Sequence, residues 1–264
     1  MQPAGKTVII TGASSGIGAA TARAFAAAGA NVVLAARDEA KLAGVAGELG
    51  SRALVVPTDV VEPAAVERLV AETVAVFGRV DILINNAGVG LAAPVAELRA
   101  ADFERAMAVD LLGPLALTQA VLPHMRRHGS GQLIYVSSVV GLRALPYLGG
   151  YAAAKAALDR LTESLRVELR GSGIAVTLVR PGTTRTGFSQ HRLGSGHERR
   201  RVSSRAATPE QVAQAILKAA AREPRVAYVR MTDRLTIAFS LLAPKLADWM
   251  LGRSFEWQEE KVKS

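Results

Sequence analysis

Short apolar runs rich in β-branched residues alternate along the chain with longer alanine-rich segments whose apolar residues recur at helical spacing. The runs predict strands at residues 6–11, 31–36, 53–57, 80–85, 132–137, 174–179 and 225–229. The segments 16–28, 63–77, 151–170 and 209–222 have the length and periodicity of helices. Because strands that alternate with helices favour right-handed crossovers, the pattern predicts an α/β fold with a doubly wound parallel sheet of about seven strands and helices on both faces.

Length and composition favour one domain over residues 1–264. A chain of 264 residues that is 50% apolar can bury a single large core. It has no cysteine, which excludes disulfides and thiolate metal sites. The start, MQPAGKTVIITG, lacks the basic stretch and apolar core of a signal peptide, so we expect a cytoplasmic protein.

The formal charge of +9 is unevenly placed. Residues 180–264 hold 16 Lys and Arg against 8 Asp and Glu, whereas the earlier part of the chain is nearly neutral. No aromatic residues are interleaved with the late arginines, so the chain lacks the stacking platforms of a nucleic-acid binder. The charge favours an anionic cofactor or substrate instead.

Residues 187–206 form the one long stretch without clear periodicity, and we interpret them as a mobile substrate lid. The lid carries Arg192, Arg199, Arg200, Arg201 and Arg205. These side chains could attract an acidic substrate such as a carboxylate, a coenzyme A thioester or an acyl carrier, or they could form a solvated face. His124 and His128 have metal-like spacing but no third ligand nearby, so no metal is expected.

A glycine-rich turn, TGASSGIG, links the first predicted strand to the first predicted helix at residues 11–18. Gly12 permits a tight turn, Gly16 allows close approach of a pyrophosphate, and Gly18 allows close packing of helix on sheet. The helix N-terminus adds free N–H groups and positive potential. The turn therefore predicts a dinucleotide site.

With NNAG at residues 85–88 and YAAAK at residues 151–155, the T-G-x-x-x-G-x-G spacing resembles the short-chain dehydrogenase/reductase family over roughly residues 6–220. The resemblance implies a Rossmann-type fold, a nicotinamide cofactor and a homodimer or homotetramer. It implies cofactor contacts from Gly12, Ser14, Ser15, Gly16, Ile17, Gly18, Asp59, Val60, Asn86, Ala87, Gly88, Tyr151, Lys155, Pro181, Gly182 and Thr186.

The end of the second strand bears on the choice of cofactor. An acidic side chain there would bind the ribose 2′-hydroxyl, whereas an arginine can pair with a 2′-phosphate. Ala36 stands where NAD-preferring members of the family carry aspartate, and Arg37 stands where many NADP-preferring members carry a basic residue. NADP is therefore predicted. Two alternatives remain: Arg37 could pair with Asp38 or Glu39, and Ser15, at a position that is basic in some NADP users, leaves dual specificity open.

Tyr151 and Lys155 lie four residues apart and so share one helix face. Carbonyl reduction needs an acid for the oxygen, and a nearby ammonium favours the phenolate that the reverse oxidation needs. The resemblance adds Ser138, 13 residues before Tyr151, as the group that orients the substrate oxygen, in preference to Ser137.

Asp110 departs from the family, which usually has asparagine at that position. In the family this residue helps hold a water that passes protons to the lysine. An ionised Asp110 would stabilise charged Lys155, a protonated one could replace the amide donor, and the residue could also bond only local backbone.

The predicted function is hydride transfer between NADP(H) and an alcohol or ketone, chiefly in the direction of reduction. The alternatives are a nucleotide-sensing or scaffold protein without turnover, and a lyase or epimerase of the same fold. The C-terminal extension, about residues 230–264, contains an apolar stretch too short to span a bilayer. It could cover a partner subunit or a cleft, which we favour, or lie on a membrane.

Overall fold

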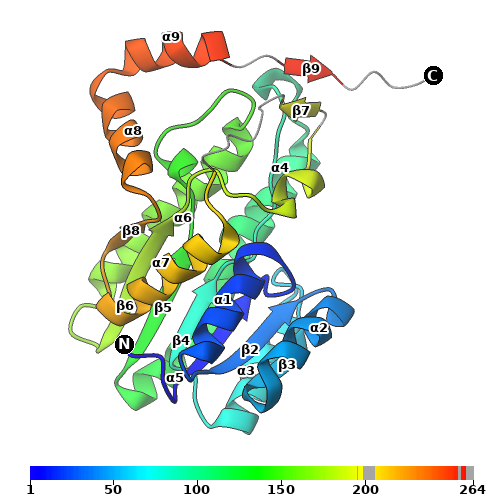
Figure 1. The fold of residues 1–264 in the computed structure, drawn as a ribbon, viewed down its shortest axis with the longest axis vertical. Helices are drawn as coiled ribbons and strands as arrows, with labels where there is room; N and C mark the ends of the chain where they lie inside the picture. Colours follow the sequence, from blue (N-terminus) through cyan, green and yellow to red (C-terminus); the bar gives the residue numbers. More distant parts are fainter. Residues whose placement is uncertain (195, 199–205, 255–256, 260–264) are drawn as a thin grey trace.

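A seven-stranded sheet in the order β3-β2-β1-β4-β5-β6-β8 runs through the molecule, and each neighbouring pair is parallel (Figure 1). The computed structural model describes residues 1–194, 196–198, 206–254 and 257–259. The strands are β1 Thr7–Thr11, β2 Asn31–Ala36, β3 Ala53–Pro57, β4 Ile82–Asn85, β5 Gly131–Val136, β6 Ile174–Arg180 and β8 Val226–Tyr228. The predicted doubly wound parallel sheet is confirmed.

Helices cover both faces of the sheet (Figure 1). The helices of the described residues are α1 Gly16–Ala27, α2 Glu39–Leu49, α3 Pro63–Phe77, α4 Ala100–Met107, α5 Gly113–His128, α6 Gly149–Glu168, α7 Pro209–Arg222, α8 Met231–Leu242 and α9 Pro244–Ser254, of which α8 and α9 extend beyond the sheet. Alternate residues of β1 enter two separate cores: Val8 and Ile10 pack under α1, α2 and α7, whereas Ile9 packs under α3, α5 and α6. Burial on both faces explains why the strands are apolar almost throughout.

The short elements are the 3-10 turns η1 Gly50–Arg52, η2 Val95–Glu97, η4 Val139–Gly141 and η5 Gly187–His191, the π-helical turn η3 Ala108–Leu112, and a small antiparallel pair, β7 Gly196–Glu198 with β9 Trp257–Glu259. The sequence analysis gave no residue range for this strand pair. It also gave none for the helices α2, α4, α5, α8 and α9.

Several predicted bounds need correction. The strand predicted at 80–85 begins at Ile82, because Asp81 ends the preceding loop and its carboxylate accepts a hydrogen bond from Thr7 N at 2.9 Å. The helix predicted at 151–170 begins two residues earlier and ends at Glu168. The other predicted strands and helices differ by at most one residue at each end. For α7, the predicted capping box of Thr208 and Gln211 is present, with Pro209 in the first turn.

The carboxyl ends of β1, β4, β5 and β6 meet along one edge of the sheet. The glycine turn follows β1, the NNAG segment follows β4, Ser138 follows β5, and Pro181 follows β6. Because ligands of open α/β sheets bind outside the carboxyl ends of the strands, this edge is where the predicted site residues come together.

Candidate active site

The turn after β1 is bonded to the segment after β4. The Thr11 hydroxyl accepts hydrogen bonds from the backbone N–H groups of Asn86 and Ala87, each at 3.0 Å. The Asn86 side-chain amide donates to the Thr11 carbonyl at 2.9 Å. These bonds hold the two predicted cofactor segments side by side, although their residues are far apart in sequence.

Two glycines of the turn have no room for a side chain. A Cβ at Gly18 would lie 2.0 Å from the carbonyl oxygen of Gly12. Gly12 itself has a φ of +66° and would place a Cβ 3.0 Å from Cα of Ala87. Helix α1 can therefore begin directly against the turn, as the predicted dinucleotide site requires.

The N-terminus of α1 keeps its donors available for an anion. Ser15 is the N-cap residue and makes no side-chain cap hydrogen bond, and the first turn holds no acidic residue. Ser14, Gly16 and Ile17 are partly exposed beside it, and Gly16 faces the Thr186 side chain. Free N–H groups at a helix N-terminus suit a pyrophosphate, so the residues present fit a dinucleotide.

Arg37 lies exposed immediately after β2, and Ala36 offers no carboxylate. In the described part of the chain, Arg37 forms no ion pair with Asp38 or Glu39. Asp38 instead caps α2 through Lys41 N at 3.0 Å and pairs with the Lys41 ammonium at 2.9 Å. The guanidinium of Arg37 is therefore free to bind an anion at this edge.

Asp59 and Val60, predicted to contact adenine, follow β3. The Asp59 carboxylate pairs with Arg105 at 3.3 Å. The Val60 side chain is buried and packs against Gly113, where an added Cβ would lie 2.8 Å from Val60 Cγ2. Val60 thus presents backbone rather than side chain to this edge.

Lys155 and Asp110 form a buried charged pair beside Tyr151, whose side chain is partly exposed. Lys155 Nζ lies 3.2 Å from Asp110 Oδ1 and 5.7 Å from the centre of the Tyr151 ring. Asp110 belongs to the π-helical turn η3, a type of distortion that is frequent at functional sites. It also accepts a hydrogen bond from Val89 N at 3.2 Å, so Asp110 bonds local backbone and Lys155 at once.

Burial and charge shift these groups in a defined way. Burial raises the pKa of Tyr151; the Lys155 charge opposes this shift, and the Asp110 charge adds to it. For Lys155, burial by itself would lower the pKa, but Asp110 and Tyr151 outweigh it and the pKa is raised. Burial also raises the pKa of Asp110, against the effect of Lys155. Tyr151 is therefore protonated and Lys155 charged at neutral pH.

The two serines after β5 point to different partners. Ser137 Oγ donates to Asp159 at 2.5 Å and is buried. The Ser138 hydroxyl lies close enough to Tyr151 to act on its pKa, and it donates to the Pro181 carbonyl at 3.5 Å. Of the two, Ser138 has the geometry to meet the same substrate oxygen as Tyr151.

The segment after β6 closes the site. The Pro181 carbonyl accepts a hydrogen bond from Val139 N at 3.1 Å, which ties this segment to the one that carries Ser138. Gly182 lies against Asp233 of α8, since a Cβ at Gly182 would lie 2.6 Å from Asp233 Oδ2. Gly88 borders the charged pair, since a Cβ there would lie 2.7 Å from Asp110 Oδ1.

Three residues of the site region were missed by the sequence analysis. The Phe188 ring lies 5.9 Å from the Tyr151 ring. Arg180 and Asp159 form a buried ion pair at 2.8 Å directly behind Ser137. An arginine at the end of the apolar strand VTLVR, and an aspartate four residues after Lys155 on the same helix face, were the signals that could have revealed this pair.

Of the predicted lid arginines, Arg192 lies close enough for its charge to lower the pKa of Tyr151, and its side chain packs over Gly90. Arg199, Arg200, Arg201 and Arg205 lie outside the described residues.

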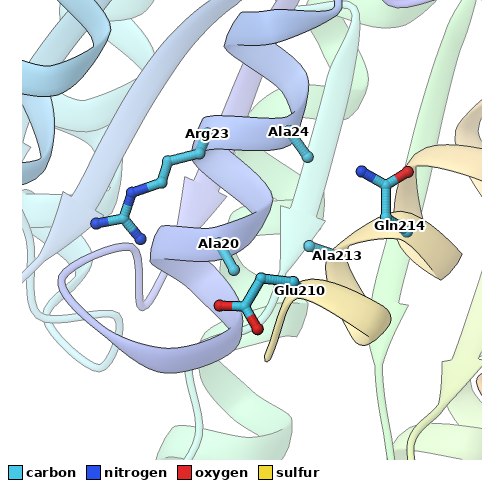
Figure 2. A pocket seen from close by; sticks show the side chains of 6 residues that line it. All are labelled: Ala20, Arg23, Ala24, Glu210, Ala213 and Gln214. Carbon is cyan, nitrogen blue, oxygen red and sulfur yellow. The ribbon is translucent and has the colours of Figure 1, made fainter. Parts of the chain in front are cut away.

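A pocket away from this cluster lies between α1 and α7 (Figure 2). It is lined by Ala20, Arg23, Ala24, Glu210, Ala213 and Gln214. None of these is a predicted site residue, and Arg23 is already paired with Glu48 at 2.6 Å. Over the described ranges, no group of three His, Cys, Asp or Glu side chains is placed to hold a metal; His124 instead contacts Arg127 at 3.0 Å.

A doubly wound parallel sheet with a glycine turn at a helix N-terminus, next to a Tyr-Lys-Ser cluster, defines the class of Rossmann-type oxidoreductases. Residues 6–194 match the short chain dehydrogenase family, and the chain belongs to that family.

Among curated relatives, the Drosophila melanogaster dehydrogenase/reductase SDR family protein 7-like is 36% identical over 96% of this chain and 81% of its own length. The ketoacyl reductase HetN of Nostoc is 32% identical over 96% of this chain and 89% of its own. A solved short-chain dehydrogenase/reductase from Burkholderia phymatum, in complex with NAD, has a TM-score of 0.86 and 29% identity, and the match covers 94% of this chain and 96% of that one. The family makes the chain an oxidoreductase with a nicotinamide cofactor.

Proposed function

We propose that the protein is an NADP(H)-dependent oxidoreductase that transfers a hydride between the cofactor and an alcohol or ketone carbon. The observation that carries this proposal is the buried pair of Lys155 and Asp110 next to the partly exposed Tyr151, with Ser138 near the tyrosine. These residues lie at the edge of the sheet where the glycine turn and the NNAG segment meet.

In the direction of reduction, Tyr151 donates its proton to the carbonyl oxygen. The Ser138 hydroxyl hydrogen-bonds the same oxygen and fixes its position beside the phenol. Lys155 remains an ammonium and stabilises the phenolate that is left. The bound nicotinamide supplies or accepts the hydride.

Asp110 supports reduction in two ways. Its carboxylate helps to keep Lys155 charged, and its own negative charge adds to the effect of burial in raising the pKa of Tyr151. The family's usual asparagine would supply neither effect. Reduction is therefore the proposed physiological direction.

The NADP preference rests on Arg37. It is exposed, it is not paired with its acidic neighbours, and it follows Ala36 rather than a carboxylate. A guanidinium there can bind a 2′-phosphate with charge-assisted hydrogen bonds. A related structure holds NAD, so a direct comparison of the two cofactors is needed.

The proposed substrate is a small alcohol or ketone with a negatively charged group, because Arg192 and Phe188 both lie against Gly90 and the Phe188 ring is 5.9 Å from the Tyr151 ring, which puts a cation near the tyrosine. A homo-oligomer in the cytoplasm remains our proposal for assembly and location.

The test is to mix purified protein with NADPH or NADH and a panel of ketones and aldehydes, including carboxylate-bearing ones, and to follow loss of reduced-cofactor absorbance. We expect consumption with at least one carbonyl and a higher kcat/KM for NADPH. Cofactor binding without turnover on any carbonyl would identify a nucleotide-sensing protein instead. Conversion of substrate without net NADPH consumption would identify a lyase or epimerase.

A further inference from the structure

Exposed apolar side chains gather on the C-terminal arm, which we define as α8 and α9, Met231–Ser254. Among the described residues, eight of the thirteen exposed large apolar side chains lie on this arm. They are Met231, Leu235, Phe239, Leu241, Leu242, Leu246, Trp249 and Met250. An apolar concentration of this kind on a soluble surface marks an interaction site.

Each helix of the arm carries its exposed residues as a stripe. Met231, Leu235, Phe239 and Leu242 follow one another at intervals of three and four along α8. On α9, Trp249 and Met250 lie three and four residues after Leu246. Leu242 is 86% exposed and Trp249 58% exposed. The side chains that face the body are fewer and smaller, chiefly Ile237, Ser240 and Ala247. The larger apolar face of the arm therefore points away from the protein.

The arm projects beyond the sheet: α8 follows β8 and runs away from the sheet, and α9 turns at the far end of α8 (Figure 1). The two helices are bent by 116° relative to one another. They have 12 and 11 residues, whereas a membrane-spanning helix needs about 20 apolar residues. Neither helix can cross a bilayer, but both can lie in its surface.

The arm carries two carboxylates and three cations. Its two carboxylates both lie against the body: Asp233 lies next to Gly182, and Asp248, although 69% exposed, pairs with Arg143. The exposed charges that remain are cations, Arg234, Lys245 and Arg253. The Arg253 guanidinium lies 4.9 Å from the centre of the Trp249 ring. A cation therefore lies next to an aromatic side chain of the type that is enriched at membrane interfaces.

We propose that the C-terminal arm docks on an anionic lipid surface, with its apolar stripes in the headgroup region and its cations on lipid phosphates. An exposed apolar stripe whose unpaired exposed charges are all basic is the composition of an interfacial amphipathic helix. A second copy of the chain fits this surface less well. In a two-fold interface the arms of both copies would meet, and the three cations of one arm would face the three cations of the other. Arg143 lies in the segment between η4 and α6, so docking brings the approach to Tyr151 next to the bilayer.

The helix Ala100–His128 also has the length and composition of a membrane span. It passes through α4, η3 and α5 and carries Asp110, which is fully buried against Lys155. It is therefore a helix of the folded core and does not compete with the arm for the bilayer.

The test is vesicle co-sedimentation of the full chain with phosphatidylcholine alone and with phosphatidylcholine containing phosphatidylserine. We expect binding to the anionic vesicles at least tenfold tighter than to the neutral ones, with loss of binding as salt rises. Leu242→Asp should weaken this binding at least tenfold. Val76→Asp is the matched control, since it puts the same charge at another exposed apolar position, on α3, and we expect less than a twofold change.

Lys245→Gln should weaken binding to the anionic vesicles about fivefold and leave binding to neutral vesicles unchanged. All variants should melt at the temperature of the wild-type protein. Equal binding of Leu242→Asp and wild type would overturn the proposal, as would no binding of the wild type. If Leu242→Asp instead dissociates an oligomer, measured by light scattering without lipid, the arm is a subunit interface and the proposal is wrong. Vesicle binding needs no turnover, so it is independent of the proposed activity.

Discussion

Lys155 Nζ and Asp110 Oδ1 lie 3.2 Å apart, and both side chains are almost completely buried beside Tyr151. A carboxylate at this distance sustains the lysine's charge, but it also cancels part of that charge's effect on the tyrosine. The pKa of Tyr151 is thus set first by burial, which raises it, and then by a pair of opposite charges rather than by a lone ammonium.

Asp110→Asn should move the pH profile of alcohol oxidation to lower pH. The Asp110 charge raises the pKa of Tyr151, so an amide lowers it, and the phenolate needed for oxidation forms at lower pH, provided Lys155 keeps its proton. The measurement is kcat/KM for oxidation across pH. The exposed Glu104→Gln on α4 is the control and should leave the profile in place. An unmoved profile for Asp110→Asn would make Asp110 structural only.

Tyr151→Phe should lower kcat by about 10²–10⁴-fold, because the proton donor is lost while the ring remains. The dissociation constant of NADPH, measured by fluorescence titration, should change less than about twofold. Tyr228→Phe at the end of the edge strand β8 serves as control and should keep full turnover. Substantial activity in Tyr151→Phe would refute the role proposed for the phenol.

Arg37→Ala should raise the KM for NADPH about tenfold or more and leave that for NADH nearly unchanged, because the guanidinium binds only the 2′-phosphate. Arg126→Ala, another exposed arginine on α5, should change neither constant. Equal effects on both cofactors would count against an NADP preference set by Arg37.

Gly18→Ala and Gly44→Ala should have opposite effects on thermal stability. The Cβ at position 18 would lie 2.0 Å from a backbone oxygen, so the turn must distort, and both the melting temperature and cofactor affinity should fall. At position 44, in α2, a Cβ meets nothing within 4 Å, and replacing a helical glycine should raise the melting temperature by about 2 °C. A neutral result at position 18 would show that the close packing of turn and helix is dispensable.

Arg180→Met should lower the free energy of unfolding by about 3–5 kcal/mol, because it leaves the fully buried Asp159 carboxylate without its cation. Chemical denaturation measures this. Glu48→Gln, which breaks the exposed pair with Arg23, is the control and should leave the unfolding free energy within experimental error. An equally small change for Arg180→Met would mean that water reaches Asp159.

The alternation of apolar runs and helical segments by itself determined the parallel sheet, since each run was long enough for one buried strand and each segment for one crossover helix. The glycine spacing likewise determined where a dinucleotide could sit, because only glycine fits positions 12 and 18. Some strand boundaries differ from the predicted ones by one or two residues. The strand β4, for example, starts only after Asp81, whose carboxylate accepts a long-range hydrogen bond from Thr7 N.

The sequence analysis did not predict helices α8 and α9 and described this region only as an apolar stretch. The reason is that their apolar stripes do not face a core. Periodicity shows that a face exists, but not what covers it.

For the site, the sequence determined the pairing of Tyr151 with Lys155, since residues four apart on a helix must share a face. Whether Asp110 would bond backbone, act as a neutral donor or pair with the lysine was decided only by the tertiary structure. The reason is physical: the π-helical turn η3 and α6 are distant in sequence, and only their packing sets the 3.2 Å distance and the burial that decide which charge is kept.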